Sequence, residues 1–312
     1  MKNVQIIIAV IGLTISCSDD SPKIDPVITW ENPSDIAFGT LLSSVQLNAQ
    51  SNVPGVFTYS PAVGEMLNEG QNQELVVVFT PTEESVYRTG SKTVFINVTS
   101  GSNAQFNSGL TYDTVSDSDN NVYKTITIGT QTWMAENLRT TKYRNGESIP
   151  EVTSNTEWKN LTSGAYSNYG NTSDVDAIAT FGRLYNWFAV TDSRNLAPTG
   201  WHVATDADWT TLTTFLGGES VAGGKLKETG TTHWNSPNTG ADNSTGFTAL
   251  PAGRREYTDG SFINTGFNGF WWTSSAYNPD YSWYRQINYD GAIVNPANFH
   301  KQYGFAIRCV KD

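Results

Sequence analysis

Short apolar stretches separated by turn-forming residues are the feature that most restricts the fold of this chain. Between residues 27 and 99 these stretches are rich in β-branched and aromatic residues, which strands prefer, and Asn, Gly and Pro lie between them. No stretch in this region has the period of an amphipathic helix. The sequence therefore predicts a small β-sandwich over 27–99, with strands at Val27–Trp30, Val45–Ala49, Val56–Tyr59, Leu75–Thr80 and Thr93–Val98.

The remaining length requires a second domain. The chain has 312 residues, more than one compact unit usually needs, and residues 100–110 are rich in Ser, Gly and Asn and are interpreted as a linker. Residues 111–312 hold nine of the ten Trp and contain one clear helix at 206–216, with Thr205 as N-cap and Asp208 completing a capping box. We expect a mainly β chain whose C-terminal domain is α+β and rich in loops. Strands are expected there at Val122–Ile128, Gln131–Met134, Trp271–Ser274, Trp283–Ile287 and Gly304–Val310.

The charge balance excludes one class of partner. Lys and Arg together number 19 against 30 Asp and Glu, which gives a net charge of −11. An acidic chain repels phosphate backbones, so no nucleic-acid partner is expected.

The N-terminus carries an export signal. Lys2 precedes an apolar stretch, Val4–Ile15, that is too short to cross a bilayer and fits a secretory signal peptide. The following Ser16-Cys17 resembles a bacterial lipobox, which implies a signal peptide over 1–16 and acylation of Cys17; an ordinary signal peptide with an incidental Cys is the alternative. Residues 17–26 are interpreted as a tether.

The first residues of the tether bear on the location. The Ser18-Asp19-Asp20 run resembles the surface-export signals of Bacteroidota lipoproteins, although an acidic linker in water would have the same composition. The resemblance implies a chain held on the outer membrane by its lipid, without a transmembrane helix, and facing the cell exterior.

Both domains resemble known families. The N-terminal region resembles a bacterial Ig-like repeat through strings such as Gln46-Leu47-Asn48-Ala49 and Val78-Phe79-Thr80-Pro81-Thr82. The C-terminal region, from about 111 to 312, is similar to the Fibrobacter succinogenes major paralogous domain. The strings that carry this similarity are Ile128-Gly129-Thr130-Gln131-Thr132-Trp133-Met134-Ala135-Glu136-Asn137-Leu138, Gly182-Arg183-Leu184-Tyr185-Asn186-Trp187, Gly200-Trp201-His202-Val203-Ala204-Thr205-Asp206-Ala207-Asp208-Trp209 and Gly304-Phe305-Ala306-Ile307-Arg308-Cys309-Val310.

A more distant resemblance suggests the fold of the second domain. The helix start at Thr205 and the terminal strand resemble the formylglycine-generating-enzyme superfamily, which implies a C-type-lectin-like architecture. The catalytic chemistry of that superfamily requires a pair of Cys, and this domain has only Cys309. Phe305, Ile307 and Cys309 alternate onto one face of a strand, so Cys309 is expected to be a buried core thiol.

No motif predicts catalysis or a resident cofactor. His202, His233 and His300 lie far apart in sequence without a metal-binding spacing, and Asp206 and Asp208 fit a helix cap better than an acid–base pair. We therefore expect a non-enzymatic protein without a metal site.

The Trp residues suggest a ligand. Indole rings stack on the apolar faces of sugars, and adjacent Trp271 and Trp272 point to opposite faces of a strand, so we expect one of them at the surface. Core packing is the alternative. Asn278 and Asp280, followed by Trp283, faintly resemble the calcium and sugar loop of C-type lectins, which would make calcium a cofactor.

The sequence thus favours a surface lipoprotein that displays a binding domain for a polysaccharide or a cell-surface protein, with the Ig-like domain as a spacer. Two other functions stay open. A secreted hydrolase would need a cleft with perturbed carboxylates, and a structural part of an outer-membrane assembly would need an exposed apolar patch.

Overall fold

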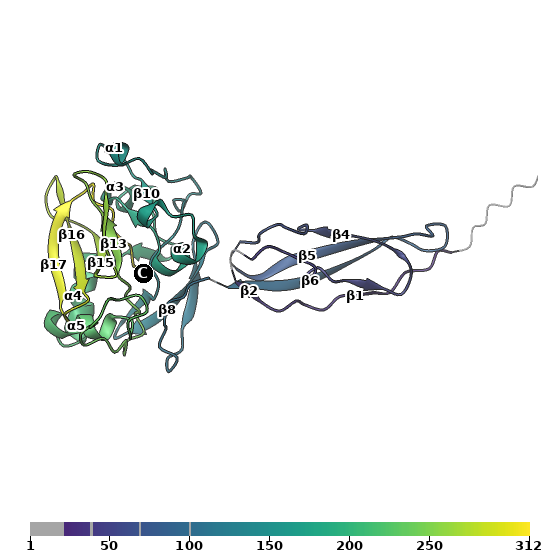
Figure 1. Ribbon diagram of the computed structural model, residues 1–312, viewed down its shortest axis with the longest axis horizontal. Coiled ribbons are helices and arrows are strands. Elements are labelled where there is room, and N and C mark those ends of the chain that lie inside the picture. The colour runs from purple at the N-terminus through teal and green to yellow at the C-terminus, as the bar shows by residue number, and fades with distance from the viewer. Residues whose placement is uncertain (1–21, 38–39, 69, 100) are drawn as a thin grey trace, which may run out of the picture.

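A computed structural model describes residues 22–37, 40–68, 70–99 and 101–312 and shows two mainly β domains joined end to end (Figure 1). The signal segment and Cys17 lie outside the described residues. None of the helices in the described part of the chain has the length and apolar character needed to cross a bilayer.

The N-terminal domain packs one four-stranded sheet against irregular segments. The sheet has the order β2 (Ile36–Ala37), β6 (Gly90–Thr99), β5 (Gly70–Pro81) and β4 (Gly55–Ser60), and a short pair joins β1 (Ile28–Thr29) to β3 (Gln50–Ser51). Alternation along β5 buries Leu75, Val77 and Phe79. The strands expected around β1, β4, β5 and β6 are confirmed.

The strand expected at Val45–Ala49 is wrong. Residues 44–46 form a turn, in which the side-chain oxygen of Gln46 accepts hydrogen bonds from the backbone N–H and the hydroxyl of Ser43. These local bonds compete with sheet pairing. Leu47 and Ala49 are nevertheless buried in the domain core, which explains their apolar character.

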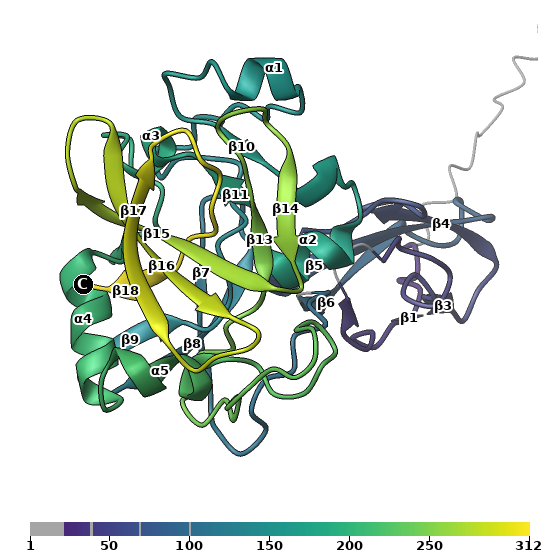
Figure 2. The same cartoon turned by 60° about the vertical axis from the view of Figure 1, so that its left-hand side comes forward.

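The C-terminal domain contains two five-stranded sheets (Figure 2). The first is antiparallel and has the order β12 (Trp201–Val203), β18 (Cys309–Lys311), β9 (Gln131–Met134), β8 (Val122–Ile128) and β7 (Asp113–Ser116). The second has the order β14 (Phe262–Thr265), β13 (Ala252–Arg255), β15 (Asn268–Ala276), β16 (Tyr281–Asn288) and β17 (Val294–His300), and only its β13–β15 pair is parallel. A small pair joins β10 (Tyr166–Ser167) to β11 (Leu184–Tyr185).

The helices of this domain are short and lie between the sheets and in the loops. They are α1 (Asn155–Trp158), the 3-10 turn η1 (Tyr169–Asn171), α2 (Val175–Phe181), α3 (Trp187–Val190), α4 (Asp206–Phe215) and α5 (Glu219–Leu226). The expected helix and its capping box at Thr205 and Asp208 are confirmed in α4. Gly217 and Gly218 end α4, as their sequence predicts. A second helix, α5, begins directly after them and was not predicted.

The terminal segment divides the domain core in two. Phe305, Ile307 and Cys309 belong to one hydrophobic cluster, whereas Ala306 and Val310 belong to the other. The expected alternation is therefore confirmed, and the Cys309 thiol is buried, which raises its pKa. Only Cys309–Lys311 forms a regular strand; residues 304–306 make isolated bridges to three other segments.

The Ser- and Asn-rich connector is held against the C-terminal domain. The Asn103 N–H donates to Thr180 Oγ1 at 2.9 Å, and the Gln105 N–H donates to the buried carboxylate of Glu228 at 2.6 Å. Phe106 packs edge-on to Tyr112 with 5.6 Å between ring centroids. The second folded unit therefore begins near residue 103.

Buried cations hold the loops of this domain together. Arg308 is fully buried and donates to Asn137 Oδ1 at 2.7 Å and to the carbonyls of Met134, Phe247 and Thr248 at 2.8 to 3.0 Å. Burial lowers the pKa of Arg308 to about 9. Buried carbonyl groups need hydrogen-bond donors. Here one guanidinium supplies the donors that the backbone N–H groups of a neighbouring strand would supply in a regular sheet.

Replacing Arg308 tests this role. Arg308→Met keeps an unbranched side chain of moderate length but removes the side-chain donor to the buried carbonyls of Met134, Phe247 and Thr248. We therefore expect a loss of at least about 3 kcal/mol in the free energy of unfolding. Urea unfolding followed by Trp fluorescence measures it. Lys311→Met, at an exposed position in β18 three residues after Arg308, should change stability by no more than about 0.5 kcal/mol. Equal effects of the two variants would contradict the assignment.

Candidate functional site

The expectation that Trp271 or Trp272 lies at the surface is wrong. Their side chains point to opposite faces of β15 as predicted, but both faces of the sheet are covered and both residues are fully buried. Trp271 Nε1 donates to Asn137 Oδ1 at 2.8 Å, and Trp272 Nε1 donates to the Tyr185 carbonyl at 3.0 Å. Neither indole can stack on a ligand.

The same holds for almost all the Trp of this domain, whose indoles are core elements. Four further indole N–H groups donate to oxygen atoms of the chain: those of Trp133, Trp158, Trp187 and Trp234. The high Trp content is thus explained by a loop-rich core. Only Trp283 is partly exposed, and the buried ones are Trp133, Trp158, Trp187, Trp201, Trp209, Trp234, Trp271 and Trp272.

Trp283 belongs to a group of accessible rings that we call the aromatic shelf: Tyr277, Tyr281, Trp283 and His300. Tyr281 and Trp283 are two residues apart on β16, so their side chains leave the same face. Tyr277 lies edge-on to Trp283 at 5.1 Å between ring centroids, and Tyr281 lies edge-on to His300 at 5.8 Å. Tyr277 is 51% exposed and Tyr281 is 38% exposed.

Strand pairing and ring stacking hold the residues of the shelf in place. Tyr281 pairs with His300 across β16 and β17, and Trp283 pairs with Asn298. Tyr257 stacks on the His300 ring at 4.7 Å and an interplanar angle of 14°. Tyr281, Trp283 and His300 stand on paired strands, whereas Tyr277 lies in the turn after β15, where its N–H donates to the Tyr281 carbonyl at 3.0 Å. These contacts fix the positions of the rings before a ligand arrives.

The loop at Asn278 and Asp280 is a turn and shows no assembled calcium site. Asn278 Oδ1 accepts the N–H groups of Asp280 and Tyr281 at 3.0 and 2.8 Å, so it is already engaged. Lys301 Nζ donates to the Pro279 carbonyl at 2.5 Å, which places a positive charge beside the loop. Within the ranges that the structure describes, no group of three or more His, Cys, Asp or Glu could hold a metal ion.

The three His residues lie in separate surroundings. His202 contacts Asp208 and Asp312, His233 contacts the buried Glu228, and His300 packs in the shelf. They do not converge on one site.

The Asp pair at the start of α4 has structural partners. Asp206 forms an ion pair with buried Arg285 at 2.7 Å, and Asp208 completes the helix cap at Thr205. Both carboxylates are therefore already engaged, as expected of a helix start.

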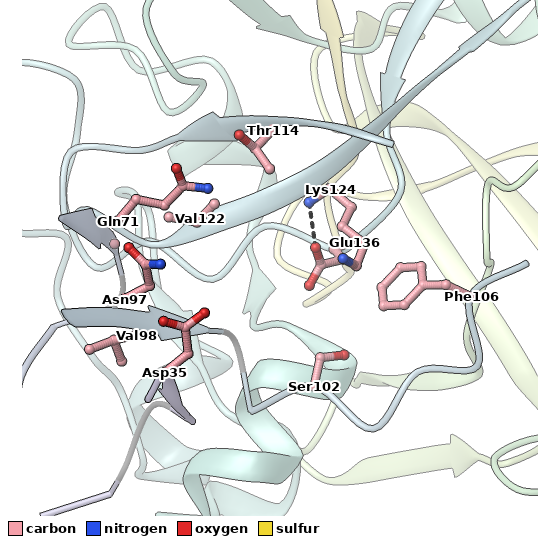
Figure 3. Close-up of a pocket in the computed structure, with 11 residues that line it drawn as sticks. Asp35, Gln71, Asn97, Val98, Ser102, Phe106, Thr114, Val122, Lys124 and Glu136 are labelled. Carbon is pink, nitrogen blue, oxygen red and sulfur yellow. Dashed lines mark hydrogen bonds between the residues drawn. The ribbon is translucent and has the colours of Figure 1, made fainter. Parts of the chain in front are cut away.

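A cavity of about 300 Å³ lies at the junction of the two domains. Figure 3 shows Asp35, Gln71 and Asn97 of the N-terminal domain facing Lys124 and Glu136 of the C-terminal domain. The Glu136 carboxylate accepts the Lys124 backbone N–H at 2.5 Å (Figure 3) and forms an ion pair with Arg139 at 3.6 Å. Glu136 therefore links the segment that follows β9 to the neighbouring strand β8.

Sequence reasoning singled out Trp283 but missed its neighbours. Tyr277 and Tyr281 flank the Asn278–Asp280 turn, and the period-two spacing of Tyr281 and Trp283 was a usable signal. His300 comes from β17, and only the strand register brings it to the shelf.

These features define a mainly β, loop-rich domain with an aromatic surface. The chain matches the Fibrobacter succinogenes major domain over residues 126–311 and belongs to that family, which confirms the resemblance read from the sequence. The match begins within β8, so β7 and the docked connector precede it. Comparisons with curated proteins and with solved structures gave no match.

His202 makes stability depend on pH. Burial favours the neutral ring, but hydrogen bonds to Asp312 at 2.7 Å and Asp208 at 3.1 Å outweigh it and raise the pKa of His202. This stabilisation is complete below the ordinary His pKa of about 6.5 and is lost as pH rises through the higher folded-state pKa. His202→Gln should therefore flatten the decline in unfolding free energy between about pH 6 and 8, measured by urea titrations. An unchanged pH slope would refute the bridging role.

Proposed function

We propose that this chain is a surface lipoprotein whose C-terminal domain binds carbohydrate through the aromatic shelf. The observation that carries the proposal is the pair Tyr277 and Trp283, perpendicular accessible rings at the start of β16 and in the turn that precedes it. An aromatic face supplies large apolar contact area at low entropic cost, and sugar C–H faces are its natural partners.

The arrangement of the chain supports display. β16 and β17 lie at the end of the C-terminal domain that is remote from the N-terminal domain (Figure 1). A chain anchored through Cys17 would hold the shelf away from the membrane, with the N-terminal domain as an Ig-like spacer. A C-type-lectin-like architecture for the second domain agrees with its loop-rich mixture of short helices and curled sheets.

A binding function is favoured over hydrolysis because the buried carboxylates, which a hydrolase would use, are hydrogen-bonded to other groups of the chain. Burial raises the pKa of Asp117, but this carboxylate accepts bonds from the Tyr123 hydroxyl at 2.5 Å and the Asn121 amide at 2.9 Å. Glu228 accepts the Gln105 N–H and contacts His233. Both groups have roles in holding the fold together.

The shelf is tested by removing its rings singly. Trp283→Ala and Tyr277→Ala should each weaken binding to the recognised glycan about tenfold while leaving the thermal unfolding temperature nearly unchanged. A glycan array identifies the ligand, and calorimetry measures affinity. Phe267→Ala removes another exposed ring, 45% accessible and outside the shelf, and should bind normally. Normal binding by the Trp283 variant would overturn the proposal.

The anchor is tested through Cys17. In cells fed a labelled fatty acid, the native chain should carry the label and sediment with membranes, and Cys17→Ser should lose both properties. Protease added to intact cells should digest the native chain if it faces the exterior. A labelled Cys17→Ser chain would exclude acylation at this residue.

A further inference from the structure

A second pocket, on the side of the C-terminal domain that faces the N-terminal domain, combines basic and apolar lining residues. Its volume is about 340 Å³. The lining includes the basic residues Arg139, Lys142 and Arg183, the apolar Val175 and Ile178 of α2, the Asp119 carboxylate, and Asn68 of the N-terminal domain. We call it the basic pocket. It lies apart from the shelf, since α2 and the β16–β17 pair occupy opposite sides of the domain (Figure 1).

Arg183 is rigidly held in this pocket. Its Nε donates to the Arg139 carbonyl at 2.8 Å, its Nη1 donates to Asn168 Oδ1, and its guanidinium lies 4.8 Å over the Tyr166 ring. These contacts fix the plane of the guanidinium. The Nη2 group takes part in none of the hydrogen bonds found among the described residues.

Arg183 differs from the other two basic residues of the pocket in its ion pairing. Lys142 pairs with Asp119 at 3.1 Å, and Arg139 pairs with Glu136. Arg183, in contrast, forms no ion pair with a carboxylate anywhere in the described ranges. An immobilised guanidinium without a counter-ion is suited to an anionic ligand, even in a chain whose net charge is −11.

The Asp119 carboxylate, which also lines the pocket, is bonded to neighbouring groups of the chain. Its Oδ2 accepts the Thr141 N–H and, at 2.9 Å, the Thr141 hydroxyl, while its Oδ1 faces Lys142. The carboxylate is thereby committed to holding the 140–142 segment, and it fixes Lys142 at the rim of the pocket.

We propose that the basic pocket binds the carboxylate or sulfate group of an acidic polysaccharide. The anion would accept hydrogen bonds from Arg183 and Lys142, while the apolar face of the sugar ring would pack on Val175 and Ile178. The Asn120 and Asn121 amides line the same pocket and offer partners for hydroxyl groups. The choice of a sugar as the carrier of the anion rests on the proposed glycan-binding function, whereas the anion site itself does not.

The test measures binding of the purified full chain to polygalacturonate, heparin and neutral dextran at low and high salt. Arg183→Gln should weaken binding of the acidic polymers at least about tenfold, and Lys142→Gln should weaken it about threefold. Polygalacturonate and heparin distinguish a carboxylate from a sulfate ligand. Lys159→Gln, at an exposed lysine outside the pocket, is the matched control and should bind normally.

The outcomes separate the two proposals. If Arg183→Gln fails to fold, Lys142→Gln decides alone, because Lys142 has 42% of its side chain exposed and is expected to tolerate replacement. Unchanged affinity in Lys142→Gln, or equal losses in Lys159→Gln, would overturn the basic pocket. Binding of neutral glycans that depends on Trp283, with no binding of either acidic polymer, would refute the pocket and leave the shelf intact. Failure of every glycan would refute both.

Discussion

The hydrogen bonds that Arg308 donates are the interaction on which the C-terminal domain depends most. This one side chain joins the segment after β9, the loop at residues 247–248 and the terminal strand. A loop-rich core carries carbonyls that no sheet or helix satisfies, and each would be costly to bury alone. Arg255 meets the same need in another region, where it donates to the carbonyls of Val152, Thr153 and Gly260. Lys227 does so with three more carbonyls.

The indole groups also supply donors to buried loop oxygens, and this role explains the high Trp content, which the sequence analysis attributed to a binding surface. An indole adds a large apolar surface and one N–H donor, so it fills the core and satisfies a loop oxygen together. Trp272 bonds to the Tyr185 carbonyl and packs 4.3 Å from Phe305 between ring centroids. An abundance of Trp therefore indicated irregular backbone in the interior, and its value as evidence for a binding surface is confined to Trp283.

The predictions that the structure confirms are those that depend only on residues close together in sequence. The β8 and β9 strands, the capped start of α4 and the alternation of Phe305, Ile307 and Cys309 followed from side-chain period and hydrogen-bonding chemistry. The burial of both Trp271 and Trp272 could not be predicted. Alternation along a strand shows that the two side chains point to opposite faces of the sheet, but it does not show whether other segments cover each face. The basic pocket was equally hidden, since Arg183 and Lys142 are brought together by the positions of distant segments.

The rigidity of this core has a consequence for binding. Three of the shelf rings stand on β16 and β17, and Tyr277 is held by a backbone hydrogen bond to Tyr281. Arg183 is held by a carbonyl, an amide oxygen and the Tyr166 ring. Neither surface has to be ordered when a ligand arrives, so little conformational entropy is lost on association. Because the shelf and the basic pocket lie on opposite sides of the domain, a single short oligosaccharide would occupy only one of them. An extended, charged polymer that wraps the domain would occupy both and gain avidity through multivalent contact, whereas two separate chains would each bind with the affinity of a single site.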